Sequence, residues 1–531
     1  MLTAASRTSL LTHATPNQNL DYTGNMDGKV CIVENPCAKR RKPSTQLTYV
    51  GKICFNMKDV LGEGSQGTTV FKGTLADGRP VAVKRVLKLN LTQINREVKA
   101  LIELDSHDNV IRYFHMETDK YFYYIVLELC VASLHDYIIK NVKIKNEDDT
   151  AISFSPVEIL QQITSGVAHL HSKDIIHRDL KPENILFSVR GSIVRAVISD
   201  LGLSKKTQLD LTSISTASGV VGTLSWMAPE ALKKEKKKIT NKVDIFSMGC
   251  IFYYTLTGGS HPYGDEVYSR PHNIVKGEYS LKGLAVAEHR LIALALSSSP
   301  TNRPSAKAIL GDPVFWGPKK QLEFLCETSD RLCSENGKSP LWKRIFADGF
   351  HVVNKNWIDR LCDDLKKEIL LPRGNSRPYD GGSVRDLLRV IRNMRHHHRD
   401  ISKEARASLG EVPDEFNHYF DSRFPDLFLH VHEAMKWCSE EIEFKSFYSD
   451  EDRLQAKQEM KLASEQKENK LTKKSALKVS VDGQSTTSTQ ENKGRALKIP
   501  SKTHNNNSNG RSALSKAKPI MKTSLPKDKN K

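Results

Sequence analysis

The sequence predicts an α+β fold with two folded parts between two polar ends. From Ile53 onward, alternating apolar residues and turn signals such as Asp77-Gly78 indicate strands. From about Ser155 the apolar residues recur at helical spacing as far as Trp316, where a second helical unit begins. We expect a disordered N-terminal segment, a two-lobed domain, an all-α domain and a disordered basic tail, at 1–52, 53–316, 317–446 and 447–531.

Length and cysteine content set the compartment that we expect. The chain has 531 residues, enough for two or three domains. Its 9 cysteines are odd in number and contain no Cys-x-x-Cys pair, which favours a reducing compartment over a disulfide framework. The best candidate for a membrane span, Met248–Leu256, is far shorter than the roughly 20 residues that a bilayer requires. We therefore expect a cytoplasmic protein with no transmembrane segment in this sequence.

The net charge of +18 is concentrated in the tail. Residues 451–531 contain 19 Lys and Arg against 8 Asp and Glu, and no Phe, Trp or Tyr. Such a segment buries too little apolar surface to offset the entropy that it would lose on ordering. We expect a solvated, disordered tail. Binding to RNA or to an acidic membrane surface is the alternative.

A glycine-rich turn, LGEGSQGTTVFKG, joins two of the expected strands. Glycine lets the backbone approach phosphate oxygens where a Cβ would clash. The pattern is weak alone, because flexible hairpins also produce it. The nucleotide-binding residues expected here are Leu61, Gly62, Gly64, Gly67 and Val70.

Two charged residues further along strengthen this interpretation. Lys84, in Val81-Ala82-Val83-Lys84, stands at the distance of the next strands and is expected to hold the α- and β-phosphates of ATP. Glu97 lies in a helical segment near Gln93 to Leu104 and is expected to pair with Lys84, which would fix the position of the lysine.

The segment IIHRDLKPENILF, residues 175–187, contains the residues expected to carry out phosphoryl transfer. Asp179 is placed to accept the proton of the attacking hydroxyl, and Lys181 to stabilise the transferring group. Asn184 and Asp200 are the expected ligands of Mg2+, which prefers oxygen ligands.

Further residues complete the pattern. Glu230, in Met-Ala-Pro-Glu, is expected to pair with Arg303, and Asp244 to brace the catalytic loop. Leu201 stands where most protein kinases have Phe, and we expect it to fill the same core position. Because six elements follow one another in the order and spacing of the protein-kinase signature set, residues 55–316 resemble a protein kinase.

The segment YIVLELC, which links the two lobes, and the residues after the kinase make the resemblance more specific. LWKRIFADGFHVVNKNWIDRL, YDGGSVRDLLRVIRNMRHHHRD and EVPDEFNHYFDSRFPDLFLHVHEAM resemble the ribonuclease extension of the inositol-requiring kinase/endoribonuclease family, the unfolded-protein-response sensors, to which ribonuclease L is related. The resemblance extends from 53 to 446. In the linking segment, Glu128 and Cys130 are expected to offer backbone groups to adenine.

RVIRNMRHHHRD, residues 389–400, lies on an expected helix. Ser383 is a good N-cap and, with Asp386, resembles a capping box. One face of the helix is apolar, formed by Val384, Leu387, Leu388 and Ile391. The other positions bring cations, an amide and imidazoles together: Arg385, Arg389, Arg392, Asn393, His396 and His397.

These residue types suit RNA cleavage without a metal, because RNA supplies its own 2′-hydroxyl nucleophile. Imidazole can act as an acid near neutral pH, and guanidinium binds phosphate oxygens. The resemblance implies that His397 is the general acid, Tyr379 acts on the 2′-hydroxyl, and Arg392 and Asn393 bind the phosphate. A tyrosine base is unusual, since the phenol pKa is ordinarily near 10. A solvated helix end or an adventitious metal site is the alternative for the three histidines.

The resemblance also implies regulation. Ser213, Ser215 and Ser218 fall where the family carries trans-autophosphorylated serines. Phosphates there would pair with Arg or Lys and favour a back-to-back homodimer with paired ribonuclease sites. Met394 stands where the stress sensor usually has Lys, which removes a phosphate contact.

Two functional hypotheses follow. The first is a bifunctional Ser/Thr kinase and endoribonuclease in stress signalling, with ATP, Mg2+, RNA and a second copy of the chain as partners. The second is a Ser/Thr kinase whose extension binds RNA or a partner without cleaving it. A scaffold that binds ATP without transferring phosphate is a weaker third hypothesis. If the sequence is part of a membrane-anchored sensor, its location would be the cytosolic face of the endoplasmic reticulum.

Overall fold

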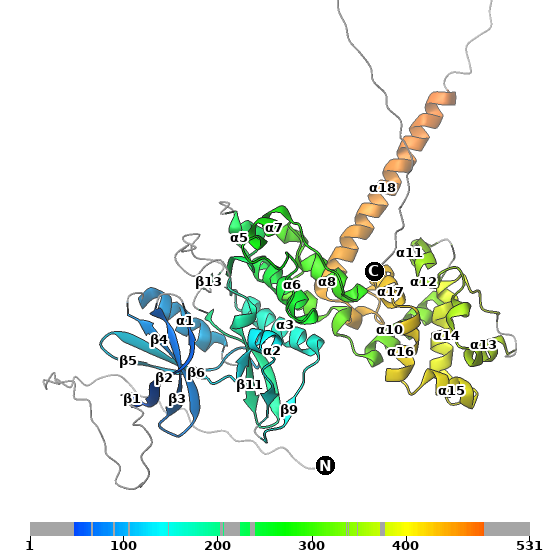
Figure 1. The fold of residues 1–531 in the computed structure, drawn as a ribbon. Coiled ribbons are helices and arrows are strands. Elements are labelled where there is room, and N and C mark those ends of the chain that lie inside the picture. The colour runs from blue at the N-terminus through cyan, green and yellow to red at the C-terminus, as the bar shows by residue number, and fades with distance from the viewer. Residues whose placement is uncertain are drawn as a thin grey trace, which may run out of the picture. The chain divides into compact units, whose positions relative to one another are not determined.

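Alternating apolar residues build an antiparallel sheet in the first part of the chain, as the computed structural model shows (Figure 1). The structure describes residues 47–482 except 65–66, 89–90, 105–106, 147, 202–204, 207–222, 234–238, 336, 338, 348 and 372–376. Six strands pair in the order β1-β2-β3-β4-β6-β5. Their bounds are β1 Leu47–Val50, β2 Ile53–Glu63, β3 Thr69–Leu75, β4 Pro80–Leu87, β5 Tyr113–Thr118 and β6 Phe122–Glu128.

This N-terminal lobe has its own small aromatic core. The rings of Phe55 and Phe71 stack at 5.1 Å, and Tyr124 lies 5.7 Å from Phe55. Helix α1 (Leu91–Leu104) follows β4. The sheet begins earlier than the sequence indicated, because Leu47 to Val50 pair with the start of β2. The expected boundary at 53 therefore moves to 47, and the rest of the expected N-terminal segment lies outside the described residues.

The second lobe is mainly helical. Its strands are β7 Ala132–Ser133, β8 Ile144–Lys145, β9 Ala151–Ile152, β10 Ile175–Ile176, β11 Ile185–Arg190, β12 Ile193–Ile198 and β13 Lys205–Lys206. Its helices are α2 Leu134–Ile139, α3 Pro156–Ser172, η2 Pro182–Asn184, α5 Pro229–Leu232, α6 Lys242–Leu256, α7 Arg270–Lys276, α8 Val286–Ala295, η4 Pro300–Asn302, α9 Ala306–Leu310 and η5 Pro313–Phe315.

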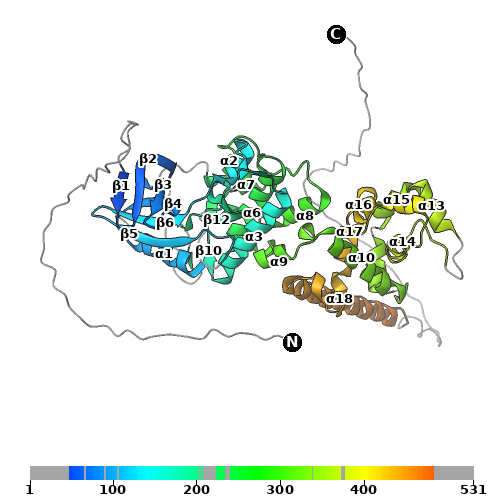
Figure 2. The same cartoon turned by 90° about the horizontal axis from the view of Figure 1, so that it is seen from below.

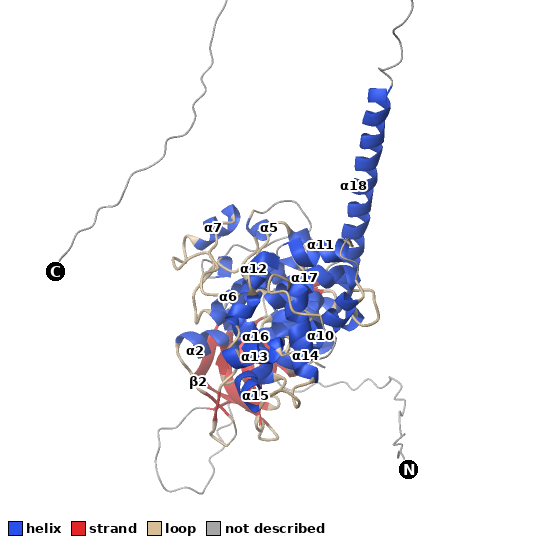
Figure 3. Ribbon diagram, turned by 90° about the vertical axis from the view of Figure 1, so that its right-hand side faces the viewer, coloured by secondary structure: helices blue, strands red, loops and turns tan. Residues whose placement is uncertain are grey.

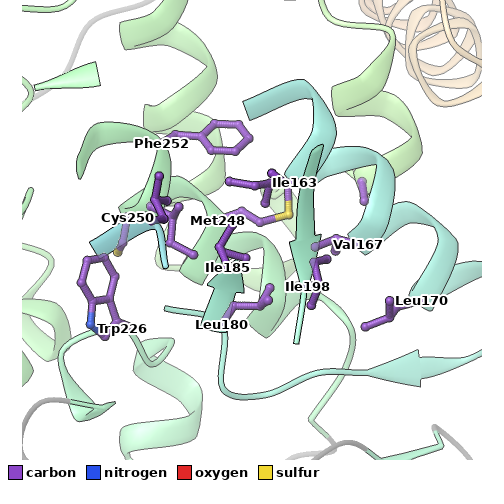
Figure 4. Packing of buried hydrophobic residues seen from close by; sticks show 14 of the residues in the cluster. Ile163, Val167, Leu170, Leu180, Ile185, Ile198, Trp226, Met248, Cys250 and Phe252 are labelled. Atoms are coloured by element: carbon purple, nitrogen blue, oxygen red, sulfur yellow. The ribbon is translucent and has the colours of Figure 1, made fainter. Parts of the chain in front are cut away.

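Helix α6 forms the centre of this lobe. Every residue from Val243 to Thr255 is buried, as expected for a short apolar run that serves as a core helix. Figure 4 shows Met248 of α6 close to Ile163 of α3 and Ile185 of β11. Leu180 and Ile185 belong to this core, so the core anchors the segment that contains Lys181 and Asn184.

Residues between Trp316 and Tyr448 form a separate all-α core, whose helix α10 lies next to α8 in Figures 1 and 2. Figure 3 shows strands only in the first part of the chain, and no described residue beyond Lys206 is in a strand. The elements are α10 Pro318–Cys333, α11 Pro340–Ala347, α12 Gly349–Val353, η6 Trp357–Arg360, α13 Asp363–Leu370, α14 Val384–His396, α15 Lys403–Leu409, α16 Asp414–Arg423, α17 Leu427–Met435, η7 Lys436–Cys438 and η8 Lys445–Phe447.

The expected disordered tail needs a correction. Phe447 and Tyr448 are buried in the all-α core, and helix α18 (Asp450–Asp482) follows them. Ser449 caps this helix, since its hydroxyl accepts the amide of Asp452 at 3.1 Å. Acidic residues in the first turn and many Lys, Glu, Gln and Ala residues favour helix without burial of a core face. The tail beyond 482 lies outside the described residues.

The described helices were also compared with the dimensions of a bilayer. Among the described residues, none of the helices combines the length and the apolar character that crossing a bilayer requires.

Candidate functional site

The first site lies between the two lobes of the kinase-like part. Lys84 of β4 donates to Glu97 of α1 at 2.5 Å and to Asp200 at 2.8 Å. The Lys84 charge lowers the pKa of Asp200 to about 2. Burial would lower the pKa of Lys84, but the carboxylates of Asp200 and Glu97 raise it instead. The ion pair predicted between Lys84 and Glu97 is therefore formed, and Lys84 is charged.

The glycine-rich turn connects β2 to β3. Leu61 and Gly62 lie near the end of β2, and Val70 lies in β3. The Gly64 amide donates to the carbonyl of Thr68 at 2.8 Å, which closes the turn. Gly67 has a φ of 74°, a left-handed conformation that favours glycine.

The catalytic loop brings three predicted residues into contact. Lys181 Nζ donates to Asp179 Oδ2 at 2.9 Å, and Asn184 Nδ2 donates to the same oxygen at 3.1 Å. Asp179 Oδ1 is buried and has no hydrogen-bond partner among the described residues. That oxygen is the atom through which we expect Asp179 to accept the proton of a substrate hydroxyl. Thr223, which sequence reasoning missed, accepts a second hydrogen bond from Lys181 at 3.1 Å.

The residues predicted to bind Mg2+ suit that ion. The side-chain nitrogen of Asn184 donates to the backbone carbonyl and to Oδ2 of Asp179. The side-chain oxygen of Asn184 is therefore left as the atom that would bind Mg2+. Asp200 uses Oδ1 for Lys84 and retains its other carboxylate oxygen. An amide oxygen and a carboxylate are the hard ligands that Mg2+ prefers.

A buried carboxylate holds the catalytic loop, as the sequence predicted, and a second predicted ion pair lies nearby in the chain. Asp244 Oδ1 and Oδ2 accept the amides of Arg178 and His177, each at 2.8 Å. Burial would raise the pKa of Asp244, but the hydrogen bond and charge of His171 outweigh it and lower that pKa. Arg303 binds Glu230 with two hydrogen bonds of 2.6 and 2.9 Å.

Two further expectations can be compared directly. Leu201 is 1% exposed and fills the core position that we expected. Ser213, Ser215 and Ser218 lie outside the described residues.

The segment that links the lobes contains a polar cluster that the sequence did not indicate. The Glu128 amide already donates to the carbonyl of Arg112 at 3.0 Å, so of its backbone groups only the carbonyl could serve adenine. The Glu128 carboxylate is buried and forms an ion pair with Arg195 and a hydrogen bond with Ser188. Burial and the Glu128 charge raise the pKa of the Cys130 thiol, which therefore stays neutral.

The second site lies on α14 in the all-α part. Asn393 Nδ2 donates to the hydroxyl of Tyr379 at 2.9 Å. His397 ends the same helix one turn later, with its amide on the carbonyl of Asn393 at 2.9 Å. The His397 side chain is 57% exposed, and its Nδ1 lies 3.3 Å from Asp400 Oδ2. Asn393 therefore contacts Tyr379 and lies one helical turn before His397, and Asp400 is a partner of His397 that we had not predicted.

Tyr379 is held by a rigid turn before α14. Trp357 is completely buried, and its ring nitrogen donates to the carbonyl of Asp380 at 3.0 Å, so its role is structural. A Cβ on Gly381 would lie 1.8 Å from Asn356 Oδ1, so a larger residue there would displace the Asn356 side chain. The ring of Trp357 meets that of Tyr379 edge-on at 6.3 Å.

The arginines of α14 differ from our expectation of one shared cationic face. Arg392 Nη1 lies 3.1 Å from Asp330 of α10, and its Nη2 lies 3.7 Å from the sulfur of Cys333. Arg385 also turns to α10, donating to the carbonyl of Cys333 at 3.1 Å. These arginines bind acceptor groups on α10, the helix that packs against α14. The helical spacing of the arginines in the sequence does not reveal which helix packs against them.

Two other details of α14 need correction. Ser383 caps the helix, but the Asp386 carboxylate does not complete a capping box and accepts the Asp380 amide at 2.8 Å instead. Met394 is 2% exposed, so its side chain packs in the core and does not face a substrate.

Comparisons with known proteins match both parts. The protein kinase domain model matches residues 55–315, and the ribonuclease 2-5A model matches residues 321–448. The serine/threonine-protein kinase/endoribonuclease ire-1 of Caenorhabditis elegans is 44% identical over 419 residues, which cover 77% of this chain and 42% of the relative. The human serine/threonine-protein kinase/endoribonuclease IRE2 is 46% identical over 412 residues, which cover 76% of this chain and 43% of the relative.

A more distant relative carries a different name. The sensor for unfolded proteins in the ER ire1 of Schizosaccharomyces pombe is 39% identical over 421 residues, covering 73% of this chain and 38% of the relative. The chain thus spans about two fifths of the length of these curated relatives.

Proposed function

Because this chain belongs to the serine/threonine-protein kinase/endoribonuclease family, we propose that it is an enzyme with both activities. The first half would transfer phosphate from ATP to serine or threonine hydroxyls, including those of a second copy of the chain. The second half would cleave RNA without a metal ion. The relatives' names mention both activities, and one relative is named a sensor for unfolded proteins, which suggests signalling of protein-folding stress.

The kinase residues have distinct roles in this proposal. Lys84, fixed by Glu97, would bind the α- and β-phosphates. Asp179 Oδ1 would accept the hydroxyl proton, while Lys181 would stabilise charge on the transferring group. Asn184 and Asp200 would hold Mg2+, which supplies positive charge to the phosphates when bound.

For the ribonuclease, one observation carries the proposal. The amide of Asn393 fixes the Tyr379 hydroxyl at 2.9 Å, one helical turn from the exposed imidazole of His397. The 2′-oxygen would attack the adjacent phosphorus, with Tyr379 acting on the 2′-hydroxyl proton. His397 would donate a proton to the departing 5′-oxygen. The products would be a 2′,3′-cyclic phosphate and a free 5′-hydroxyl.

The decisive experiment uses a stem-loop RNA in EDTA. We expect the wild-type chain to cleave it, His397→Ala to lose at least about 100-fold in rate, and a 2′-deoxy nucleotide at the cut position to block cleavage. Asp179→Ala, dimerised by a nucleotide-site ligand, should still cleave. An uncut RNA, or cleavage that survives His397→Ala, would contradict the ribonuclease assignment.

A separate experiment tests the kinase half. Radiolabel from the γ-phosphate of ATP should appear on the chain and be absent from Asp179→Ala. Mass spectrometry should find phosphate on Ser213, Ser215 or Ser218. Label that persists in Asp179→Ala would mean that another kinase is responsible.

One observation favours the second hypothesis, an extension that binds RNA without cleaving it. The Arg392 guanidinium, expected on the scissile phosphate, pairs with Asp330. Retention of the stem-loop RNA with no cleavage in the EDTA experiment is the result that this alternative predicts. Analytical ultracentrifugation with and without nucleotide would test the proposed dimer.

A further inference from the structure

Arg389 of α14 lies against the ring of Tyr379. Its guanidinium carbon is 4.4 Å from the centre of that ring. Its Nη2 donates to the carbonyls of Arg377 and Pro378, at 2.7 and 3.1 Å. The side chain is 16% exposed, so this arginine is enclosed by the segment that carries Tyr379.

A buried carboxylate completes the attachment. Asp386 is fully buried, and Arg389 Nη1 lies 3.4 Å from its Oδ1. The same carboxylate accepts Arg377 Nη2 at 2.7 Å and the Asp380 amide at 2.8 Å. The residues on both sides of Tyr379 are therefore tied to α14.

The Tyr379 ring is thus fixed at two points. The Arg389 cation lies over its face, and the Asn393 amide binds its hydroxyl at 2.9 Å. A cation over an aromatic ring is attracted to the ring face, and the two carbonyl hydrogen bonds add direction that a point charge lacks.

We infer that Arg389 is a positioning residue of the ribonuclease site, which acts by holding Tyr379 where its hydroxyl meets the 2′-oxygen of the substrate. The inference rests on the proposed ribonuclease function. We do not assign RNA binding to Arg389, because its side chain is 16% exposed and its guanidinium is held by two carbonyls and a buried carboxylate. A misplacement of about 1 Å at a catalytic group can cost roughly 100-fold in rate.

The chain contains a matched control on the same helix. Arg385 is four residues earlier, and its guanidinium carbon lies 5.2 Å from the ring of Trp342. It also donates to a backbone carbonyl, that of Cys333, at 3.1 Å. Arg385 and Arg389 each lie over an aromatic ring and donate to a backbone carbonyl, but Arg389 contacts the tyrosine and the buried carboxylate of Asp386, and Arg385 contacts neither.

A double-mutant cycle tests the inference by activity. Arg389→Met should lower kcat about 10- to 100-fold with little change in KM, and Arg389→Lys should restore part of the loss. In the Tyr379→Phe background the same substitution should change kcat less than about twofold, because the residue acts through the tyrosine. Arg385→Met should leave kcat unchanged. Equal losses from Arg389→Met in both backgrounds, or no loss in the wild type, would overturn the inference.

A second measurement does not depend on RNA cleavage. Nitration of Tyr379 by tetranitromethane, followed by mass spectrometry in the full chain, reports how firmly the ring is held. We expect nitration several-fold faster in Arg389→Met than in the wild type or in Arg385→Met. Equal rates in all three proteins would refute the positioning role, whereas absence of RNA cleavage by the wild type would count against the proposed function alone.

Discussion

His432 is an imidazole enclosed by aromatic rings in the all-α core. Its ring lies 4.7 Å from that of Tyr448 and 5.3 Å from that of Trp316, and the residue is 3% exposed. Burial lowers the pKa of His432 well below the ordinary value of 6.5. The native state therefore keeps this group neutral at a pH where the unfolded chain binds a proton.

This shift gives a pH dependence with a defined sign. Above pH 6.5 His432 is neutral in both states, and the free energy of unfolding has its full value. Below pH 6.5 the unfolded state gains a proton that the native state excludes, so the free energy of unfolding falls. From pH 7.5 to 5.5 the wild type should lose about 1.4 kcal/mol more than His432→Phe. Urea unfolding at both pH values measures the difference. His351→Phe, at an exposed histidine, should behave as the wild type, and an equal loss in His432→Phe would refute the assignment.

The Glu128 carboxylate is a second buried charge, and Arg195 compensates it. The two side chains are 6% and 9% exposed. Removal of one partner from a buried pair leaves an uncompensated charge, so Arg195→Met should destabilise the kinase part by about 3–5 kcal/mol. Chemical denaturation followed by circular dichroism would measure this loss.

Arg190 supplies the control for this prediction. It lies 3.4 Å from the same carboxylate but is 45% exposed. Arg190→Met should cost less than about 1 kcal/mol, as surface ion pairs do. Similar effects of the two substitutions would show that the Glu128 charge is compensated from solvent instead.

At the level of single elements, α14 shows what the sequence could predict. Its cap and its apolar face follow from local spacing, and Ser383, Val384 and Ile391 are placed as expected. The direction of the Asp386 side chain depends on the irregular turn at 377–382. The direction of the Arg392 side chain depends on α10, which is distant along the chain. Sequence spacing contains no information on those neighbours, so the site was predicted as a set of residues but not as a geometry.

The cap of α14 makes a prediction at this scale. The Ser383 hydroxyl accepts the Asp386 amide at 3.3 Å, and the residue is 5% exposed. Ser383→Ala should destabilise the ribonuclease part by about 1 kcal/mol, while Ser383→Thr, which keeps the acceptor, should cost less. Urea titration of both variants compares the two losses, and equal losses would mean that packing and not capping is responsible.

Across the whole molecule, sequence patterns predicted the two folded parts and their order, because ordered motifs and long helical periods are local signals. They missed β1, whose four residues gain stability only by pairing with β2. They also missed α18, because low apolar content was taken as disorder although the segment has strong helix formers and a serine cap. Composition measures how much of a segment can be buried and does not measure helix propensity.

The first turn of α18 joins the ribonuclease part to the kinase part. Glu451 Oε2 accepts the Ser305 amide at 3.1 Å and lies 3.9 Å, through Oε1, from Lys242. Asp450 pairs with Lys307 at 3.0 Å. Lys242 in turn donates to the carbonyl of Arg303 at 2.5 Å, the arginine that holds Glu230. These contacts connect α18 to the Arg303–Glu230 ion pair of the kinase part.

Reversal of charge at this turn should loosen the connection between the two parts. The double variant Asp450→Lys/Glu451→Lys would place cations beside Lys242 and Lys307, so repulsion should replace attraction. We expect calorimetry to resolve separate unfolding of the two parts, with the difference from wild type shrinking in 1 M NaCl, where the Debye length is about 3 Å. Glu465→Lys makes the same kind of charge reversal once, at an exposed site of the same helix, and should unfold as the wild type does. If the double variant and Glu465→Lys gave the same calorimetric trace, the first turn of α18 would not couple the kinase and ribonuclease parts.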